Sequence, residues 1–567
     1  MKQERIDMLR AFWTWDPVSS GTYRAFDEPF AYSHNKWFFD KSVWQKMFRT
    51  MSECGFNAMI LANTHPFPFL IDLSKYPEAR VIDDALLAEY QRMHHWVFET
   101  ALDYDIACYL LFFSIYYPEP MLKARGIEPG KTSMPSDLAL EYTHHCTRTL
   151  METYPELTGI VGEASENIAE KREEFIQQAI VDAVDAARPD ASIYLRGWCG
   201  HPGHFIEKIK RRGDRPLGYS VKYTFEHLVD PNPDPAFADW LEPAGAQNVI
   251  AEFWISNFEP WSSFSYETVE GTLSYLQDSG CGGFSIHPLS LYEWPRTSDN
   301  YFKYQWQRDM LWYNAWGGNP VSTLLRRGHP KWLARNKDLL PGMEAGSRIM
   351  ELLGLYFAGD KQNQWHPQFC SVRDYDLISG HLFSIEDMLR IDEQEIFWGR
   401  NWWQEVTGDQ VVHLKEHVES GTPPDAYGPD ELIEELADLS AQAVEAGEKG
   451  MHVSPKEKEL PSFVRDAFCM GRLGEFYVER LRAALAHARG SDDEAVDHMA
   501  RALGLYKEIR AVDSYHRGPF RVITGRATVI GDWTDTVRAL AAEYEDAIKG
   551  DFKPGREYPI HKVEGSA

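Results

Sequence analysis

Short apolar runs and longer stretches with helical spacing alternate along residues 8–316. The apolar runs cover 8–13, 57–61, 107–113, 158–161, 192–195, 218–221, 249–255 and 283–286. The helical stretches cover 42–53, 84–102, 136–153, 168–187, 205–212, 266–278 and 302–316, with a weaker sixth crossover at 235–244. Short apolar runs that alternate with helices are typical of buried parallel strands. Eight such runs predict a (β/α)8 barrel over residues 1–317.

An open, doubly wound sheet is the competing architecture for this pattern. In that fold a glycine-rich GxGxxG turn often opens the first helix and binds a dinucleotide. The chain has no such motif at the start of a predicted helix, so a dinucleotide cofactor has no support. We therefore favour the closed barrel.

Residues 318–567 show a different pattern, in which helical periodicity dominates. It covers 342–357, 431–446, 462–488, 493–512 and 534–548. This predicts a mainly α-helical C-terminal domain. Apolar faces within 463–485 and 503–512 predict a homodimer formed through these helices. The alternative is that the helices pack on one another and on the flank of the barrel.

Charge and cysteine content exclude several classes of protein. The chain of 567 residues carries a formal net charge of −28, which argues against a nucleic-acid partner. It has no continuous apolar run of the length that spans a membrane and no apolar segment typical of a secretory signal, so we expect a cytoplasmic protein unless a leader has been removed. The seven cysteines are scattered and never form CxxC, which fits a reducing compartment and no metal site.

The aromatic content is high: 13% of the chain, including 19 tryptophans. Part of it must fill the core. Aromatic rings also stack on the apolar faces of sugars, while the sugar hydroxyls need carboxylates and amides. An acidic chain rich in tryptophan and tyrosine therefore fits an oligosaccharide substrate.

In a (β/α)8 barrel the working residues lie at the carboxyl ends of the strands and in the loops that follow. Acidic, aromatic, amide and basic side chains gather at these places in the sequence. The candidates are Asp16, Asn63, His65, Glu163, Glu166, Arg196, Trp198, Lys222, Glu226, Glu252, Trp254, Glu259, His287 and Trp294. Such a collection indicates a carbohydrate site.

Glycoside hydrolysis needs two carboxyl groups on opposite sides of the scissile bond. One donates a proton to the leaving oxygen, and the other attacks the sugar or activates water. Glu163 and Glu166 follow the fourth strand, and three carboxylates lie across the predicted mouth: Glu226, Glu252 and Glu259. The sequence alone leaves open which of them is the acid and which the base.

Glu252 lies inside an apolar run, where an unpaired carboxylate would be costly. Arg196 and Lys222, which end neighbouring predicted strands, are its plausible partners. The same two cations could instead bind a carboxylate of the substrate, since arginine offers a bidentate fork. The pair therefore has two possible roles, and we predict the second, in which both cations bind a carboxylate of the substrate.

Several segments resemble the glycoside hydrolase family 67 α-glucuronidases. GFNA at 55–58 leads to Asn63 as in the second-strand segment of that family, VGEASE at 161–166 is similar to its V-K-A-D-S-E, and SVK at 220–222 to its Q-I-K. EFWISNFE at 252–259 resembles its E-[LF]-Q-I-T-Q-E, although both base positions are displaced by one residue.

The resemblance implies that Glu166 is the general acid and that the base lies near Glu226 or Glu259. It also implies inversion of configuration, no metal or other cofactor, and dimerisation through the C-terminal helices. We therefore predict an exo-acting glycoside hydrolase that releases an acidic sugar from the non-reducing end. Two alternatives stay open: a barrel lyase, isomerase or epimerase that uses Lys222 or a metal, and a carbohydrate-binding barrel without catalysis.

Overall fold

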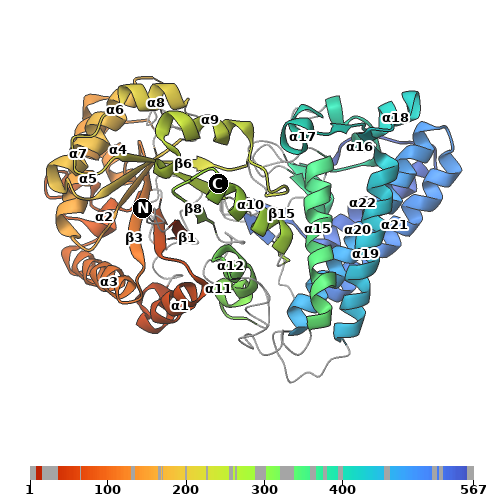
Figure 1. The fold of residues 1–567 in the computed structure, drawn as a ribbon, viewed down its shortest axis with the longest axis horizontal. Helices are drawn as coiled ribbons and strands as arrows, with labels where there is room; N and C mark the ends of the chain where they lie inside the picture. The colour runs from red at the N-terminus through yellow and green to blue at the C-terminus, as the bar shows by residue number, and fades with distance from the viewer. Residues whose placement is uncertain are drawn as a thin grey trace, which may run out of the picture.

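Eight parallel strands close into a barrel in the structure, a computed structural model (Figure 1). The strands are β1 (Leu9–Trp15), β2 (Ala58–Asn63), β3 (Ala107–Phe113), β4 (Gly159–Glu163), β5 (Ser192–Arg196), β6 (Leu217–Lys222), β7 (Val249–Phe253) and β8 (Gly283–Ile286). Each strand pairs with the next, and β8 pairs with β1, where Leu9 lies opposite Gly283. The predicted barrel is confirmed, and the strand ends fall within two residues of the predicted runs.

The structure describes residues 8–15, 36–63, 65–128, 135–163, 168, 170–197, 201–224, 228–253, 260–261, 265–287, 302–319, 337–357, 365–373, 380–393, 400–451, 460–513, 520–522 and 528–557. No helix within these ranges has the length and apolar character that crossing a membrane requires.

Helices cover the outside of the barrel (Figure 1). They are α1 (Lys41–Cys54), α2 (Phe67–Leu70), α3 (Asp84–Leu102), α4 (Glu119–Arg125), α5 (Asp137–Thr153), α6 (Arg172–Ile176), α7 (Asp182–Ala187), α8 (Pro202–Lys208), α9 (Pro235–Ala244), α10 (Tyr266–Asp278), α11 (Gln305–Arg308) and α12 (Met310–Trp316). A π-helical turn, Gln177–Val181, joins α6 to α7. The weak sixth crossover of the sequence is therefore a helix, α9.

Local sequence signals set the ends of these helices. At the start of α3 the Asp83 carboxylate accepts the backbone N–H of Leu86 at 2.8 Å. At the end of α1, Gly55 has a φ of 101°, in the left-handed region that glycine tolerates best. A β carbon on Gly55 would also lie 2.6 Å from the carbonyl oxygen of Gly317, so the close approach of α1 and α12 needs glycine there as well.

One predicted helix is too long. Helix α8 ends at Lys208, whereas the periodicity predicts helix to residue 212. Beyond that point, two side chains of the preceding helical segment accept hydrogen bonds from the backbone N–H groups. Gln177 Oε1 accepts the N–H of Lys210 at 2.7 Å, and Asp185 Oδ2 accepts that of Arg212 at 2.8 Å. These long-range hydrogen bonds replace helical ones and hold the segment as a loop.

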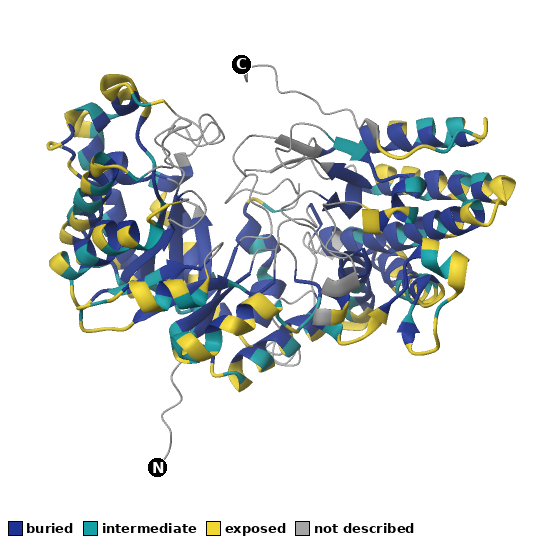
Figure 2. Ribbon diagram, turned by 90° about the horizontal axis from the view of Figure 1, so that it is seen from above, coloured by how far each residue is buried: buried dark blue, intermediate teal, exposed yellow. Residues whose placement is uncertain are grey.

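The C-terminal domain is mainly helical, as predicted. Its helices are α15 (Leu340–Tyr356), α16 (Ile385–Leu389), α17 (Arg400–Thr407), α18 (Leu414–Ser420), α19 (Pro429–Met451), α20 (Leu460–Ala488), α21 (Asp492–Val512) and α22 (Trp533–Ala547). Its short strands are β9 (Trp365–His366), β10 (Ser371–Arg373), β11 (Gly380–Leu382), β12 (Gln410–Val411), β13 (Ala426–Tyr427), β14 (Phe520–Val522), β15 (Thr528–Gly531) and β16 (Arg556–Glu557). Figure 2 shows the buried residues on the barrel strands and on the inward faces of the helices.

The apolar faces of α20 and α21 pack within this domain and, at Phe463, against Phe302 of the barrel segment. Phe463, Phe476, Leu485, Leu503 and Ile509 are all buried, and α20 packs against both α19 and α21. The described parts of these helices therefore lack the uncovered faces from which the homodimer was predicted. The homodimer stays a prediction that only the family resemblance supports.

Candidate active site

A buried ionic cluster lies at the carboxyl ends of the barrel strands. Glu163 and Arg196 are the last residues of β4 and β5, and Glu252 is the penultimate residue of β7. Arg196 Nη1 lies 3.0 Å from Glu163 Oε2, while its Nε and Nη2 lie 2.8 and 2.5 Å from the two oxygens of Glu252. The carboxylates are 0% exposed and the arginine is 4% exposed. One guanidinium thus joins two carboxylates from strands on either side of it.

Barrel topology explains why residues so far apart in sequence meet here. In parallel strands the carboxyl ends share one rim, and alternate side chains point into the barrel. Arg196 on β5 lies opposite Ser220 on β6, and Lys222 at the end of β6 lies opposite Glu252 on β7. Ser220 is small, so the arginine side chain reaches Glu252 past it. The Ser220 hydroxyl itself donates to Glu252 Oε2 at 3.2 Å.

His287, directly after β8, completes the cluster on its other side. Its Nε2 lies 3.4 Å from Glu252 Oε1. The ring of Trp13 on β1 packs against the imidazole, with ring centroids 3.5 Å apart. The Glu252 carboxylate is therefore surrounded by Arg196, Ser220 and His287.

These contacts determine the charge states of two members. Burial alone would raise the pKa of Glu252, but Arg196 and His287 outweigh burial and hold that pKa well below its usual value. Burial lowers the pKa of His287 to about 4, although the Glu252 carboxylate opposes the shift. At neutral pH Glu252 is thus ionised and His287 uncharged. Glu252 can stabilise positive charge, but it cannot serve as a proton donor there.

Asn63 is the last residue of β2, His65 lies two residues further on, and both are also buried. The Asn63 side-chain oxygen accepts the backbone N–H of His65 at 2.9 Å. The His65 Nε2 lies 3.0 Å from the hydroxyl of Tyr142 on α5. Burial lowers the pKa of His65 to about 3, so its ring is neutral. Lys222 at the end of β6 is partly buried and lies close enough to act electrostatically on His287.

The structure therefore brings together four of the predicted site residues: Glu163, Arg196, Glu252 and His287. Seven other candidates lie outside the described residues and stay predictions: Asp16, Glu166, Trp198, Glu226, Trp254, Glu259 and Trp294.

Two members of the cluster were not among the predicted site residues, namely Ser220 and Trp13. Ser220 carries a detectable signal, because it interrupts the apolar run Leu217–Lys222 at a position two residues before Lys222. Trp13 carries none, since a tryptophan inside an apolar strand is equally typical of the core.

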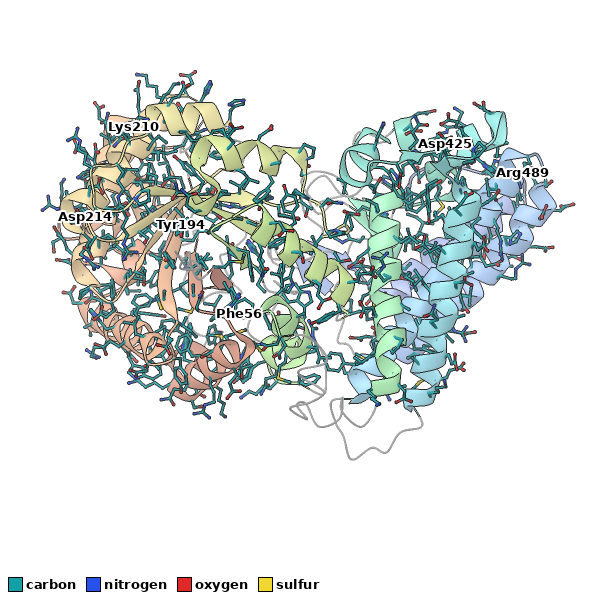
Figure 3. All side chains as sticks on the ribbon, viewed as in Figure 1. Phe56, Tyr194, Lys210, Asp214, Asp425 and Arg489 are labelled. Carbon is teal, nitrogen blue, oxygen red and sulfur yellow. The ribbon has the colours of Figure 1, made fainter. Side chains whose placement is uncertain are left out.

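The described residues also form an open surface hollow of about 360 Å³ elsewhere. It lies at the amino-terminal end of β6 and is lined by Lys210, Asp214 and Leu217 among others. Figure 3 shows Lys210 and Asp214 at the outer edge of the barrel, on the side away from the helical domain. Working residues of this fold lie at the opposite strand ends, so the hollow is not the candidate site. Within the described ranges, histidine, cysteine and acidic side chains nowhere group as a metal site would need.

No protein-family model matches the sequence, and neither does any curated protein. Among solved structures, the chain is similar to a GH138 enzyme targeting pectin rhamnogalacturonan II. The TM-score is 0.80 at 20% sequence identity, and the match covers 95% of this chain and 67% of that one. At this identity the similarity shows that both domains share the fold of that enzyme.

Other solved structures match about half of the chain. The exo-beta-1,4-mannosidase Op5Man5 from Opitutaceae bacterium strain TAV5 has 11% identity and a TM-score of 0.33 over 49% of this chain and 51% of that one. A family 1 β-glucosidase from Thermotoga maritima has 8% identity and a TM-score of 0.34 over 50% of this chain and 88% of that one.

The two buried histidines predict a dependence of stability on pH. An unfolded histidine has a pKa near 6.5, whereas His65 and His287 have values of about 3 and about 4 when folded. Between these values the unfolded chain binds more protons than the folded chain, so the free energy of unfolding falls as the pH drops below about 6.5. Above about pH 6.5 the stabilising contribution of the two neutral histidines is fully present. Each histidine contributes up to about 1.4 kcal/mol per pH unit in this window.

Urea unfolding of the protein and of His65→Gln at pH 7.0, 6.0 and 5.0 measures this contribution. The variant should lose less stability than the wild type as the pH falls. Parallel curves for the two proteins would contradict the assignment of a neutral, buried His65.

Proposed function

We propose that the protein is an exo-acting glycoside hydrolase that releases an acidic sugar from the non-reducing end of an oligosaccharide. The observation that carries the proposal is the buried Glu163–Arg196–Glu252 cluster at the carboxyl rim of the barrel. The fold shared with a GH138 enzyme that targets pectin rhamnogalacturonan II supports it. Burying charges in that position costs free energy of desolvation. The need to stabilise charge during a reaction is a physical reason for a protein to retain them.

In the proposed mechanism two carboxyl groups act on opposite sides of the glycosidic bond. Glu166, three residues beyond Glu163, donates a proton to the leaving oxygen. Glu259 or Glu226 positions the attacking water. Glu252 stays ionised. Its negative charge favours the protonated form of the catalytic acid, and it stabilises the positive charge that develops on the sugar ring.

Lys222 is the cation we assign to the carboxylate of the substrate. The guanidinium of Arg196 is engaged by Glu163 and Glu252, which gives it the role of neutralising those carboxylates. Lys222 ends β6, next to the loop that carries Glu226. An ammonium at a partly buried rim position interacts strongly with an incoming carboxylate, even in a chain of net charge −28.

Lys222→Met should therefore reduce kcat/KM for an acidic glycoside far more than for the matching neutral one. We expect a loss of about 1.5–3 kcal/mol in transition-state stabilisation on the acidic substrate. Paired aryl glycosides that differ only in CH2OH or COOH at the sugar measure the difference. Lys222→Arg keeps the charge and is the matched control. Equal losses on both substrates would show that Lys222 serves the protein's own carboxylates instead.

The stereochemical outcome follows from the resemblance to inverting enzymes. An inverting site leaves room for a water between carboxyl groups about 6.5–9.5 Å apart, whereas a retaining site holds them about 5–5.5 Å apart. We expect inversion. NMR of the first-formed sugar, recorded before mutarotation, should show the anomer opposite to that of the substrate, and the same anomer would contradict the proposal.

A further inference from the structure

Two loops at the rim of the barrel are built into the core of the helical domain. Val229 lies in the loop between β6 and α9, and Trp261 lies in the loop between β7 and α10. Both are buried, at 3% and 1% exposure, and both belong to the hydrophobic core of the helical domain and not to that of the barrel. Val229 is three residues beyond Glu226, and Trp261 is two residues beyond Glu259. The helical domain thus packs against residues that lie two and three positions along the chain from two candidate catalytic carboxylates.

Trp261 makes directional contacts with the helical domain. Its indole Nε1 donates to Asp513 Oδ1 at 2.9 Å, and its ring stacks on Trp533 with centroids 5.2 Å apart and planes 13° apart. Asp513 directly follows α21, and Trp533 is the first residue of α22. Trp261 is therefore held by both ends of the segment that carries β14 and β15.

The backbone next to Glu259 is also held from the barrel side. The carbonyl oxygen of Pro260 accepts a hydrogen bond from Arg308 Nη1 at 3.2 Å. Arg308 is buried, and its Nε and Nη2 donate to the two oxygens of Asp309 at 2.6 and 3.0 Å. A guanidinium fixed in this way gives a rigid anchor one residue after Glu259.

The far end of the same loop is capped by α15. Glu344 Oε1 accepts the backbone N–H groups of Tyr266 and Glu267, the first residues of α10, at 2.7 and 3.0 Å. Glu351 Oε2 accepts the hydroxyl of Thr268 at 2.8 Å. An acidic side chain on the first N–H groups of a helix is a favourable cap, and here the cap comes from the other domain.

The loop between β6 and α9 is held in a similar way. Val229 is buried in the hydrophobic core of the helical domain. The hydroxyl of Tyr223 donates to the carbonyl oxygen of Pro231 at 2.5 Å. Both loops therefore have one anchor in the barrel and one in the helical domain.

We propose that the helical domain is part of the catalytic unit, because it positions the loops that carry Glu226 and Glu259. Asp513 and Trp533 are positioning residues, which act on the reaction only through Trp261. The inference rests on the proposed function, in which one of these carboxylates orients the attacking water. Such a reaction depends on the separation of two carboxyl groups, and a misplacement of about 1 Å is enough to cost a large factor in rate.

Substitutions at the Trp261–Asp513 contact test the proposal in the full-length protein. Asp513→Ala removes the acceptor, and Trp261→Phe removes the donor while keeping an aromatic ring against Trp533. Asp513→Asn keeps a side-chain oxygen that accepts the same hydrogen bond. Tyr477→Phe is the matched control, since it removes a buried hydrogen bond of 2.9 Å to the Pro367 carbonyl in the same core, away from the loops.

Two readouts are needed: amide hydrogen exchange of peptides covering residues 254–265, and steady-state kinetics well below the melting temperature. We expect Asp513→Ala and Trp261→Phe to speed exchange in these peptides and to lower kcat about tenfold to a hundredfold, with KM within about twofold. Asp513→Asn and Tyr477→Phe should leave both readouts close to the wild type.

Unchanged exchange in Asp513→Ala would overturn the proposal, and so would faster exchange without a fall in kcat. An equal fall in kcat for Tyr477→Phe would overturn it too, because the effect would then follow stability alone. A wild-type protein that hydrolyses none of the glycosides would refute the proposed function and with it the catalytic part of this inference. The exchange experiment would still decide whether the helical domain holds the loop.

Discussion

Glu166→Gln is expected to lower kcat by about a hundredfold to ten-thousandfold, because it removes the proton that the leaving oxygen requires. Glutamine has the same shape as glutamate and keeps its hydrogen-bonding capacity, so substrate binding should persist. Rapid-quench or steady-state kinetics on an alkyl glycoside measure the loss, and calorimetric titration with the same glycoside measures binding. The role of Glu166 rests on its position after β4 and on the family resemblance.

The leaving group distinguishes a general acid from a residue that merely supports the fold. An aryl leaving group of low pKa departs without protonation, so Glu166→Gln should retain most of its activity on such a substrate. Glu170→Gln is the matched control, since Glu170 is exposed and lies four residues further along the chain. A fall that is independent of the leaving group would contradict the role of Glu166.

Arg196→Met is expected to cost about 3–5 kcal/mol of unfolding free energy, because it leaves Glu163 and Glu252 buried without their cation. Methionine keeps much of the aliphatic bulk of arginine, so the loss reports charge and not a cavity. Urea unfolding measures it. The double variant Arg196→Met/Glu252→Gln should lose less than the sum of the two single variants, since the second change removes one of the unpaired charges.

Arg188→Met provides the comparison for an exposed ion pair. Arg188 pairs with Asp190 through two hydrogen bonds of 2.9 Å, but their side chains are 23% and 60% exposed. Such a pair contributes about 1 kcal/mol or less. An Arg196→Met protein as stable as Arg188→Met would contradict the picture of a buried, mutually dependent cluster.

The barrel was predictable because most of its strands are buried on both faces. A strand such as Ala58–Asn63 is buried at every position. Its sequence is therefore a nearly continuous apolar run, which differs from the helical periodicity of the segments on either side. The error at α8 has the opposite origin. Residues beyond Lys208 have helical periodicity, but hydrogen bonds from Gln177 and Asp185 determine their backbone. Local pattern carries no information about donors and acceptors that lie more than 20 residues away.

The sequence predicted that Glu163, Arg196, Glu252 and His287 lie at one rim, but it did not predict how they pair. The sequence offered both Arg196 and Lys222 as partners of Glu252. Lys222 is the direct neighbour of Glu252 in register, and Arg196 reaches the same carboxylate from two strands away. The contact of Arg196 depends on which side chains point into the barrel and on the small size of Ser220 between the two residues. His65 shows the same limit, because it follows β2 at the rim but binds Tyr142 of α5.

The most direct test of the central proposal is a comparison of matched aryl glycosides with the purified protein. The set pairs α- and β-glucuronides and galacturonides with the corresponding glucosides and galactosides, adds a sialoside, and is repeated with EDTA. The account predicts turnover of an acidic glycoside with a kcat/KM at least about tenfold above that of its neutral partner, a difference of about 1.4 kcal/mol, and no effect of EDTA. Preference for the neutral partner, or loss of turnover with EDTA, would contradict it.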